Sequence, residues 1–337
     1  MSATTECMVE VTRGGVVESR HRIHAAVVDA EGRLRAFAGD PDLVTFFRSA
    51  AKPLQALPLV EDGAYDRYGL TPEELALCCG SHSGSLEHTR RVERILEKGA
   101  VTSEDLACGP HAPFDDEARR RLEEAHLEPG RIHNNCSGKH AGMMMLARAH
   151  GWDPADYQRP EHPVQQRMLS EVSRWSRMPV EAIGVATDGC GVVCFALPLR
   201  QMAVAFAGFA AAVRAGERSP TAVFEAMTAH PVMVAGEGRI CTELMRQAAG
   251  RLFAKVGAEG VYCVGVPGAE LGIALKVEDG AARAVAPAIL GILRELDLIS
   301  EDDYGALHHH AYPELLNTRG EPVGQIRPAI ALQVPDA

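Results

Sequence analysis

The sequence predicts an α/β (α+β) protein in which both ends of the chain build one antiparallel sheet and a helical part lies between them. Short strand-like runs with hairpin signals occupy residues 7–38 and return at 261–277, whereas residues 71–250 have mostly helical patterns. Regular strand–helix alternation and internal repeats are absent from the sequence. We therefore predict a single domain over residues 1–337, with a sheet part of about 1–48 and 251–337 and a helical part of about 49–250.

The N-terminal segment predicts an antiparallel meander. Its extended runs are rich in β-branched residues, and glycine pairs or Glu-Gly separate them, as is typical of hairpin turns. The runs are Met8–Val11, Val16–Glu18, Ile23–Val28 and Leu34–Phe37.

The middle of the chain carries helix signals. Thr71 is followed by Pro72 and, three residues after the threonine, by Glu74, which together form a capping box. Short extended runs are expected at 185–187 and 192–196, and a solvated loop at His308–His310. Further helices are expected after Ser85 and Ser137 and at about 115–125, 163–175, 199–215, 220–229, 239–250 and 281–296.

Composition excludes several classes of protein. The 337 residues carry a net charge of -11 and only 5% aromatic residues, which argues against a nucleic-acid partner. The first residues hold no apolar leader, and the uncharged stretch 201–213 is too short to span a bilayer, so we expect a cytoplasmic protein that binds no membrane. Nine cysteines, an odd number, predict reduced thiols, with metal ligands among the options.

The first candidate for chemistry is the Ser-x-x-Lys motif formed by Ser49 and Lys52. On a helix that begins near Ser49, residues i and i+3 share a face, so the amine is expected above the hydroxyl, as a base beside a nucleophile. Only 5 of the 34 basic residues are lysines. A chain that uses arginine for most positive charges favours a chemical role for Lys52, because a guanidinium does not give up its proton.

Two further motifs follow in a meaningful order. Ser81-His82-Ser83 comes after the first helical stretch, and Lys255-Val256-Gly257 enters the late strands. A Ser-x-x-Lys, a Ser-x-polar and a Lys-x-Gly in this order are typical of the penicillin-recognising serine hydrolases. Their alternative roles are loop caps for the serines and a surface position for Lys255.

A third constellation contains potential metal ligands. Cys136 and His140 stand at i and i+4 of a predicted helix, a spacing that lets two side chains face one metal, and Cys190 can complete a set of three. Zinc is one interpretation, and inert buried thiols are the other. Cys241 is a possible neighbour whose role the sequence leaves open.

These residues together resemble the rhizobial-type L-asparaginases over nearly the whole chain, in the segments Arg48–Pro53, Cys79–Ser83, Cys136–His140, Thr187–Cys190, Val234–Arg239 and Leu275–Gly280. The resemblance implies a serine-β-lactamase-like or penicillin-binding-protein-like fold, a homodimer, and hydrolysis of L-asparagine to L-aspartate and ammonia. Around 150–180, around 210–220 and at the C-terminal end, the sequence departs from the family pattern.

The resemblance also assigns roles to individual residues. Its two Ser-Lys tandems would be Ser49 with Lys52 and Ser81 with Lys255. Its Zn²⁺ ligands would be Cys136, Lys139 and Cys190, in place of the His140 suggested by spacing. Arg48, Asn135, His140 and Asp188 would line the pocket of a zwitterionic amino acid.

Three alternatives remain open at this point. A glutaminase and a β-lactamase-like enzyme of the same fold would use the same serines and lysines, but neither chemistry requires the Cys136, Lys139 and Cys190 set. A non-catalytic zinc-binding protein would explain the cysteines and leave Ser49 and Lys52 without a role.

Overall fold

The computed structural model describes residues 7–335, so the terminal residues included in the predicted domain, 1–6 and 336–337, lie outside it. Its main sheet has eight antiparallel strands in the order β10-β11-β1-β2-β9-β8-β7, with β3 pairing with β2. A second sheet has the order β4-β6-β5. The strands are β1 (Met8–Arg13), β2 (Val16–Asp29), β3 (Leu34–Ala38), β4 (Val44–Phe46), β5 (Gly184–Thr187), β6 (Val193–Pro198), β7 (Phe253–Gly257), β8 (Val261–Val266), β9 (Leu271–Val277), β10 (Glu314–Leu316) and β11 (Pro322–Ala329).

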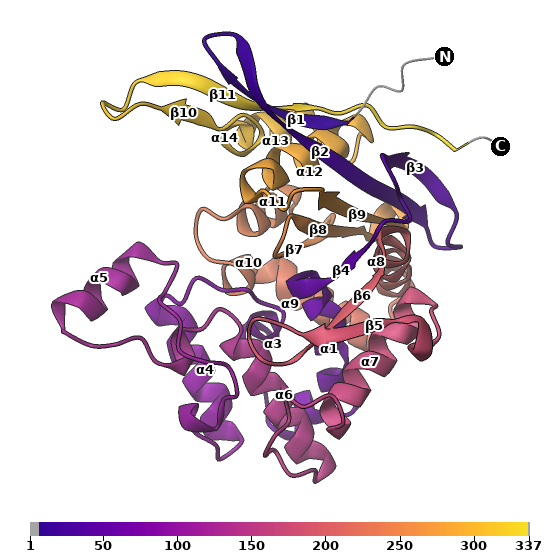
Figure 1. Ribbon diagram of the computed structural model, residues 1–337. Helices are drawn as coiled ribbons and strands as arrows, with labels where there is room; N and C mark the ends of the chain where they lie inside the picture. Colours follow the sequence, from indigo (N-terminus) through magenta and orange to yellow (C-terminus); the bar gives the residue numbers. More distant parts are fainter. Residues whose placement is uncertain (1–6, 336–337) are drawn as a thin grey trace.

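The predicted architecture is confirmed, since the strands of the main sheet come from residues 8–38 and 253–329, and the helices between them form the lower half of Figure 1. The helices are α1 (Lys52–Glu61), α2 (Ala64–Arg67), α3 (Pro72–Cys78), α4 (Leu86–Lys98), α5 (Asp116–Glu124), α6 (Ser137–His150), α7 (Pro163–Ser176), α8 (Leu199–Arg214), α9 (Arg218–Ala229), α10 (Pro231–Val234), α11 (Ile240–Ala248), α12 (Val285–Glu295), α13 (Glu301–Ala306) and α14 (His308–Ala311). None of the described helices is long and apolar enough to cross a bilayer.

The hairpins form where glycine permits a left-handed turn. Gly14, Gly15 and Gly32 all have positive φ, at the β1–β2 and β2–β3 connections. The two runs predicted at Val16–Glu18 and Ile23–Val28 are one long strand, β2, whose first half alternates in exposure and whose second half is buried on both faces. Buried pairing on both sides therefore extends the strand beyond its local signals.

The C-terminal region differs most from the expectation. His308–His310 form a short helix, α14, where we expected a loop, and the strands β10 and β11 follow it. Strand β11 pairs with β1, from the opposite end of the chain. The sequence contains no strong local signal for this short helix, which is stabilised by its packing on α12.

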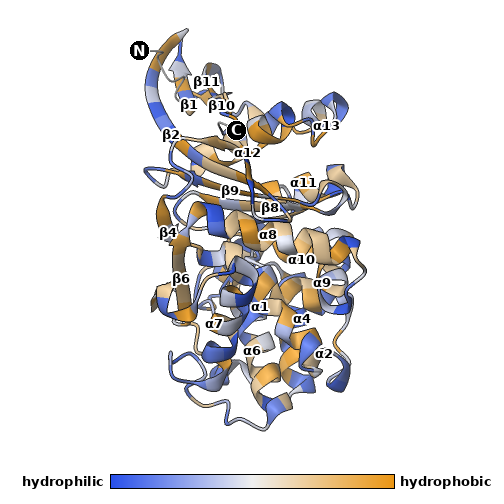
Figure 2. Cartoon of the chain, turned by 90° about the vertical axis from the view of Figure 1, so that its right-hand side faces the viewer, coloured by the Kyte–Doolittle hydropathy of each residue, from blue (hydrophilic) through white to orange (hydrophobic). Residues whose placement is uncertain are grey.

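Two helices enclose the main sheet. Helix α8 packs on β2, β8 and β9, and α12 packs on the opposite side of the sheet, as Figure 2 shows. One connected cluster of buried apolar side chains runs through both the sheet and the helical part. The catalytic candidates are thus carried by elements that share a core.

The closest approach of helix and sheet is at Gly272. A Cβ atom there would overlap the backbone of Ala203 and Ala207 in α8. We predict that Gly272→Ala lowers the free energy of unfolding by about 1–3 kcal/mol or more, because neither backbone can yield without moving the helix. Urea unfolding would measure the loss. Gly268→Ala, in a turn where the added Cβ meets nothing within 4 Å, is the control, and equal stability of the two variants would contradict the prediction.

Candidate active site

The serine predicted to be the nucleophile lies on a tight turn that leads into α1. Ser49 belongs to a 3₁₀ turn, Arg48–Ala51, and Lys52 is the first residue of α1. Arg48 has a φ of 50°, in the left-handed region. Ser49 is half-buried, and its hydroxyl has no hydrogen-bond partner in the described part of the chain. It is therefore available to a ligand.

The Lys52 amine does not bond to Ser49, contrary to the expectation from i, i+3 spacing. Its Nζ contacts the Gly80 carbonyl oxygen at 2.5 Å, Ser81 Oγ at 3.0 Å and Cys136 Sγ at 3.2 Å. Burial lowers the pKa of Lys52, against the opposing effect of Cys136. The lysine of the first motif is thus hydrogen-bonded to the serine of the second.

Ser81 also contacts Lys255, as the resemblance implied. Lys255 lies in β7 and is fully buried, and its Nζ is 2.9 Å from Ser81 Oγ and 2.8 Å from the carbonyl oxygen of Val256. Burial lowers the pKa of Lys255 to about 7, with a further contribution from Lys52. Two amines therefore share one hydroxyl oxygen, and mutual repulsion opposes both of them being charged.

The backbone around Ser81 is held from α10. The Ser81 N–H donates to the Val234 carbonyl oxygen at 2.8 Å, and the neighbouring Gly80 lies so close to the carbonyl of Met233 that a side chain there would overlap it. Because backbone contacts with α10 fix the loop at Gly80 and Ser81, the Gly80 carbonyl and the Ser81 hydroxyl are held in place without the lysine side chains that they contact.

Three proposed metal ligands meet at the N-terminus of α6. Lys139 Nζ lies 3.0 Å from Cys190 Sγ, and the thiol groups of Cys136 and Cys190 are hydrogen-bonded to each other. The hydrogen bond from Cys136 and the charge of Lys139 lower the pKa of Cys190 to about 4. Burial opposes the charge on Lys139, but the two sulfurs and Asp188 raise its pKa above the usual value.

This donor set suits zinc, which binds sulfur and nitrogen ligands. Among residues 7–335, no cluster of three or more His, Cys, Asp or Glu side chains is arranged to hold a metal ion. Two cysteines alone are too few for a structural site, so a metal bound here would depend on the Lys139 amine as the third donor.

His140 hydrogen-bonds to Tyr157 and to neither sulfur, so the described contacts do not support the spacing argument for it as a ligand beside Cys136. Its Nδ1 lies 2.6 Å from the hydroxyl of Tyr157, and its buried Nε2 has no partner among the described residues. The Tyr157 oxygen already accepts the N–H of Ala107 at 2.9 Å, so its own proton points to Nδ1. Burial lowers the pKa of His140 to about 3. The ring is therefore neutral and carries its proton on Nε2, as an unused donor.

Opposite charges stand beside the serines. Arg48 Nε donates to Asp188 Oδ1 at 2.8 Å. Burial opposes ionisation of Asp188, but Lys139 and Arg48 together lower its pKa. The side-chain amide of Asn135 has no partner in the described structure and faces the same cavity as Ser49 and Ser81. The site thus offers an ion pair next to Ser49 in the sequence and a free amide in the cavity of the two serines.

The comparisons with known proteins decide the family. A family model described as L-asparaginase II matches residues 9–328. The chain belongs to the L-asparaginase II family. The family description supports an amidohydrolase. No curated protein matches the chain.

Two solved structures are similar to this family member at low identity. Mglu in its native form is 16% identical, with a TM-score of 0.38, over 83% of this chain and 66% of that chain. This chain therefore spans slightly less than two thirds of the length of Mglu. The LovD6 mutant of simvastatin synthase from Aspergillus terreus is 15% identical, with a TM-score of 0.37, over 76% of this chain and 84% of that one. Scores this low support no argument about function.

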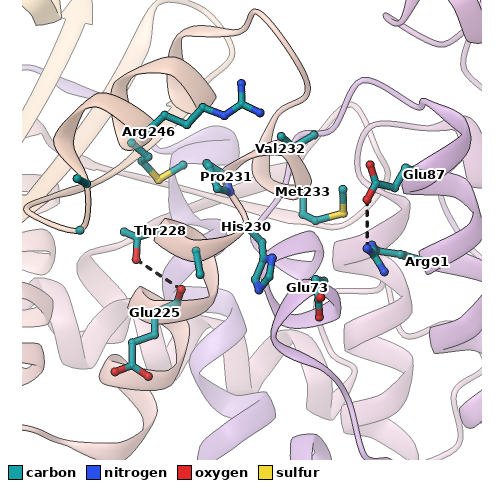
Figure 3. A pocket seen from close by; sticks show the side chains of 14 residues that line it. Glu73, Glu87, Arg91, Glu225, Thr228, His230, Pro231, Val232, Met233 and Arg246 are labelled. Atoms are coloured by element: carbon teal, nitrogen blue, oxygen red, sulfur yellow. Dashed lines mark hydrogen bonds and ion pairs between the residues drawn. The ribbon is translucent and has the colours of Figure 1, made fainter. Parts of the chain in front are cut away.

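The cavity beside the serines has a volume of about 350 Å³. Ser49, Ser81 and Asn135 line it, and so does Cys241, whose sulfur accepts the N–H of Val256 at 3.3 Å. Figure 3 shows a larger cavity of about 620 Å³ around His230, between α3 and α4 on one side and α9 to α11 on the other. That cavity contains none of the predicted site residues of this L-asparaginase II family member.

Sequence reasoning missed two residues of the site. Tyr157 orients His140, but it lies in the stretch 150–180 where the sequence departs from the family pattern, so no motif pointed to it. Arg239 also lines the cavity and donates to the Ser81 carbonyl oxygen. It belongs to Val234–Arg239, one of the segments that resemble the family, but such a resemblance does not show that the guanidinium lies beside the serines.

Proposed function

We propose that this enzyme is an L-asparaginase that hydrolyses L-asparagine to L-aspartate and ammonia, with Ser49 as nucleophile. The observation that carries the proposal is the Ser81 hydroxyl shared by Lys52 and Lys255, next to an unpartnered Ser49 in one cavity. A serine becomes nucleophilic when an adjacent base takes its proton, and a buried neutral lysine is such a base.

The proton path follows from the hydrogen bonds. A neutral Lys52 has two N–H groups and one lone pair, so one of its three contacts cannot be a donation by the amine. That lone pair takes the Ser49 proton as Ser49 Oγ attacks the side-chain carbonyl, by a hydrogen bond that forms when substrate binds. Ser81, between Lys52 and Lys255, passes a proton to the leaving nitrogen as the C–N bond breaks.

The acyl-enzyme is an ester of Ser49 with the side-chain carboxyl of aspartate. Water attacks this ester with the same amines as proton acceptors, which releases aspartate and restores the serine. The low pKa of Lys255, about 7, supports this role, because a lysine of ordinary pKa would remain charged at neutral pH.

The α-groups of asparagine fit the charges on the other side of the serines. Arg48 would bind the α-carboxylate and Asp188 the α-ammonium, so a zwitterion would insert into the existing ion pair. The unused Nε2–H of His140 would supply a neutral hydrogen bond on that side, and the free amide of Asn135 would supply one from the cavity of the serines.

We also propose a zinc ion held by Cys136, Lys139 and Cys190, in agreement with the donor set described above. When bound, zinc would supply a fixed positive charge that keeps both sulfurs as thiolates. The serines and lysines already provide the nucleophile and base, so the three ligands serve to fix Lys139, His140 and Asp188 around the substrate. A lysine ligand must be neutral, so acid should weaken zinc binding.

The family resemblance further supports a homodimer, a cytoplasmic location and a single catalytic unit. Sedimentation equilibrium that gives twice the chain mass of 36.2 kDa would support the dimer, and a single-chain mass at micromolar concentration would refute it.

The main test replaces the proposed nucleophile. Ser49→Ala should lower kcat for asparagine by at least about 10³-fold, because it removes the proposed nucleophile and Ser81, the other serine of the cavity, is held between Lys52 and Lys255, while asparagine still binds. Ammonia release from asparagine, glutamine and a β-lactam, measured in parallel, identifies the substrate, and calorimetry measures binding by the variant. Ser85→Ala, outside the cavity, is the control. Near-normal turnover by Ser49→Ala, or faster turnover of glutamine or the lactam, would refute the proposal.

The second prediction concerns pH. Above its pKa of about 7, Lys255 is neutral and accepts a proton, whereas below it the amine is charged. We therefore expect kcat/KM to rise with pH, with a half-maximal value near pH 7. Circular dichroism over the same range checks that the fold persists. A profile that is flat from pH 5.5 to 8.5 would exclude Lys255 as the titrating group.

The third prediction concerns zinc. Removal of zinc by a chelator, or Cys190→Ser, should raise KM more than it lowers kcat, because the ligands position the substrate and do not generate the nucleophile. Elemental analysis measures zinc per chain, and Cys7→Ser, which changes a thiol that donates to the Ala331 carbonyl oxygen and is not a proposed ligand, should retain it. An unchanged KM with kcat reduced by orders of magnitude would instead assign the catalysis to zinc.

A further inference from the structure

The cavity at Ser49 and Ser81 extends away from the proposed zinc ligands. Its lining includes neither Arg48 nor Asp188, and neither Lys139 nor His140. Instead it continues along the edge of the main sheet to Arg239, which immediately precedes α11. The reacting serines therefore stand between two chemically different regions, and the α-groups of asparagine account for only one of them.

Arg239 is a cation without a carboxylate partner in the structure described. One Nη1–H donates to the Ser81 carbonyl oxygen at 3.3 Å, and the guanidinium lies 5.4 Å from the ring centre of Phe114. Arg48, by contrast, is neutralised by Asp188. Most of the five N–H donors of Arg239 are thus available to an anion, and a guanidinium binds a carboxylate through two parallel hydrogen bonds.

The size of this region exceeds what asparagine requires. The leaving group of asparagine is ammonia, which is about as large as water, whose share of liquid volume is roughly 30 Å³. The cavity of about 350 Å³ also has an apolar wall, formed by Ile240, Val256 and Val285. The structure therefore has room for a much larger amine on the leaving side of the scissile bond.

We infer that the enzyme also cleaves β-aspartyl amides whose leaving amine carries a carboxylate, such as β-aspartyl dipeptides, and that Arg239 binds that carboxylate. The inference rests on the proposed function. Ser49 Oγ bonds to the β-carbonyl carbon, the C–N bond breaks, and the departing amino acid takes the proton from Ser81. Water then cleaves the Ser49 ester to give aspartate, so the two products are aspartate and a free amino acid.

Glu259, the acidic residue that lines the cavity, opposes the binding of a carboxylate by Arg239 only weakly. Glu259 is exposed at the rim, where water and salt screen its repulsion of a carboxylate. Arg239 is half-buried and lies beside the Ser81 backbone, where screening is weaker. In a β-aspartyl dipeptide only one carbon separates the leaving nitrogen from the carboxylate. A cation that binds this carboxylate must therefore lie close to Ser81, as Arg239 does.

The test compares two substrates that differ in one charge, β-aspartylglycine and β-aspartylglycinamide, with asparagine as the reference. Wild-type enzyme should show a kcat/KM for the glycine compound at least about tenfold above that for the glycinamide, the effect of one charge-assisted hydrogen-bonded pair. Arg239→Met should bring the ratio close to one, and Arg239→Lys should retain part of it. Arg90→Met, which removes an exposed arginine outside the cavity, should leave the ratio unchanged.

The outcomes separate this inference from the proposed function. Cleavage of asparagine without cleavage of β-aspartylglycine, or a wild-type ratio near one, would overturn the inference and leave the asparaginase standing. An equal loss for all three substrates in Arg239→Met would also overturn it, by assigning Arg239 to the α-carboxylate. Cleavage of β-aspartylglycine alone would support the subsite and refute the asparaginase, and no cleavage of any substrate would overturn both.

Discussion

The site depends on two buried amines that share one hydroxyl. Lys52 and Lys255 both reach Ser81 Oγ, and no carboxylate of residues 7–335 bonds to either amine. Burial of an unpaired charge is costly, so the fold favours the neutral, reactive form of each lysine. This arrangement requires α1, the loop after α3 and the edge strand β7 to keep fixed positions relative to one another. The shared core of sheet and helices provides that constraint.

Local signals predicted those parts of the fold in which neighbouring residues decide the structure. Glycine pairs placed the first hairpins, and the capping box at Thr71 was confirmed. The strand β11 could not be found this way, because it has proline at both Pro322 and Pro328 and is stabilised by pairing with β1, more than 300 residues away. Similarly, the full length of β2 reflects pairing of its first half with β1 and of its buried second half with β3 and β9.

The same limit applies to the site. Scarcity of lysine pointed to Lys52, but the same argument would also select the buried Lys276, which only donates to backbone carbonyls as a structural group. Spacing placed Lys52 over Ser49, whereas its contact with Ser81 depends on a loop 29 residues away. The rotation of His140 toward Tyr157 is likewise a tertiary effect that no spacing rule contains.

The distribution of charge around the serines explains why Arg239 is the candidate to bind an anion. The pairs Arg48 with Asp188 and Lys139 with Cys190 each cancel, so the region assigned to the zwitterion is nearly neutral, as a zwitterion requires. Lys255, whose pKa near 7 leaves it about half charged at pH 7, is not among the described residues that line the cavity. In a chain of net charge -11, a half-buried guanidinium with no acidic partner is then the one strong attraction for an anion inside the cavity, among its described lining residues. The asymmetry between a neutral region and a cationic one, on opposite sides of the same serines, matches an amide whose acyl half is an amino acid and whose amine half is an acid.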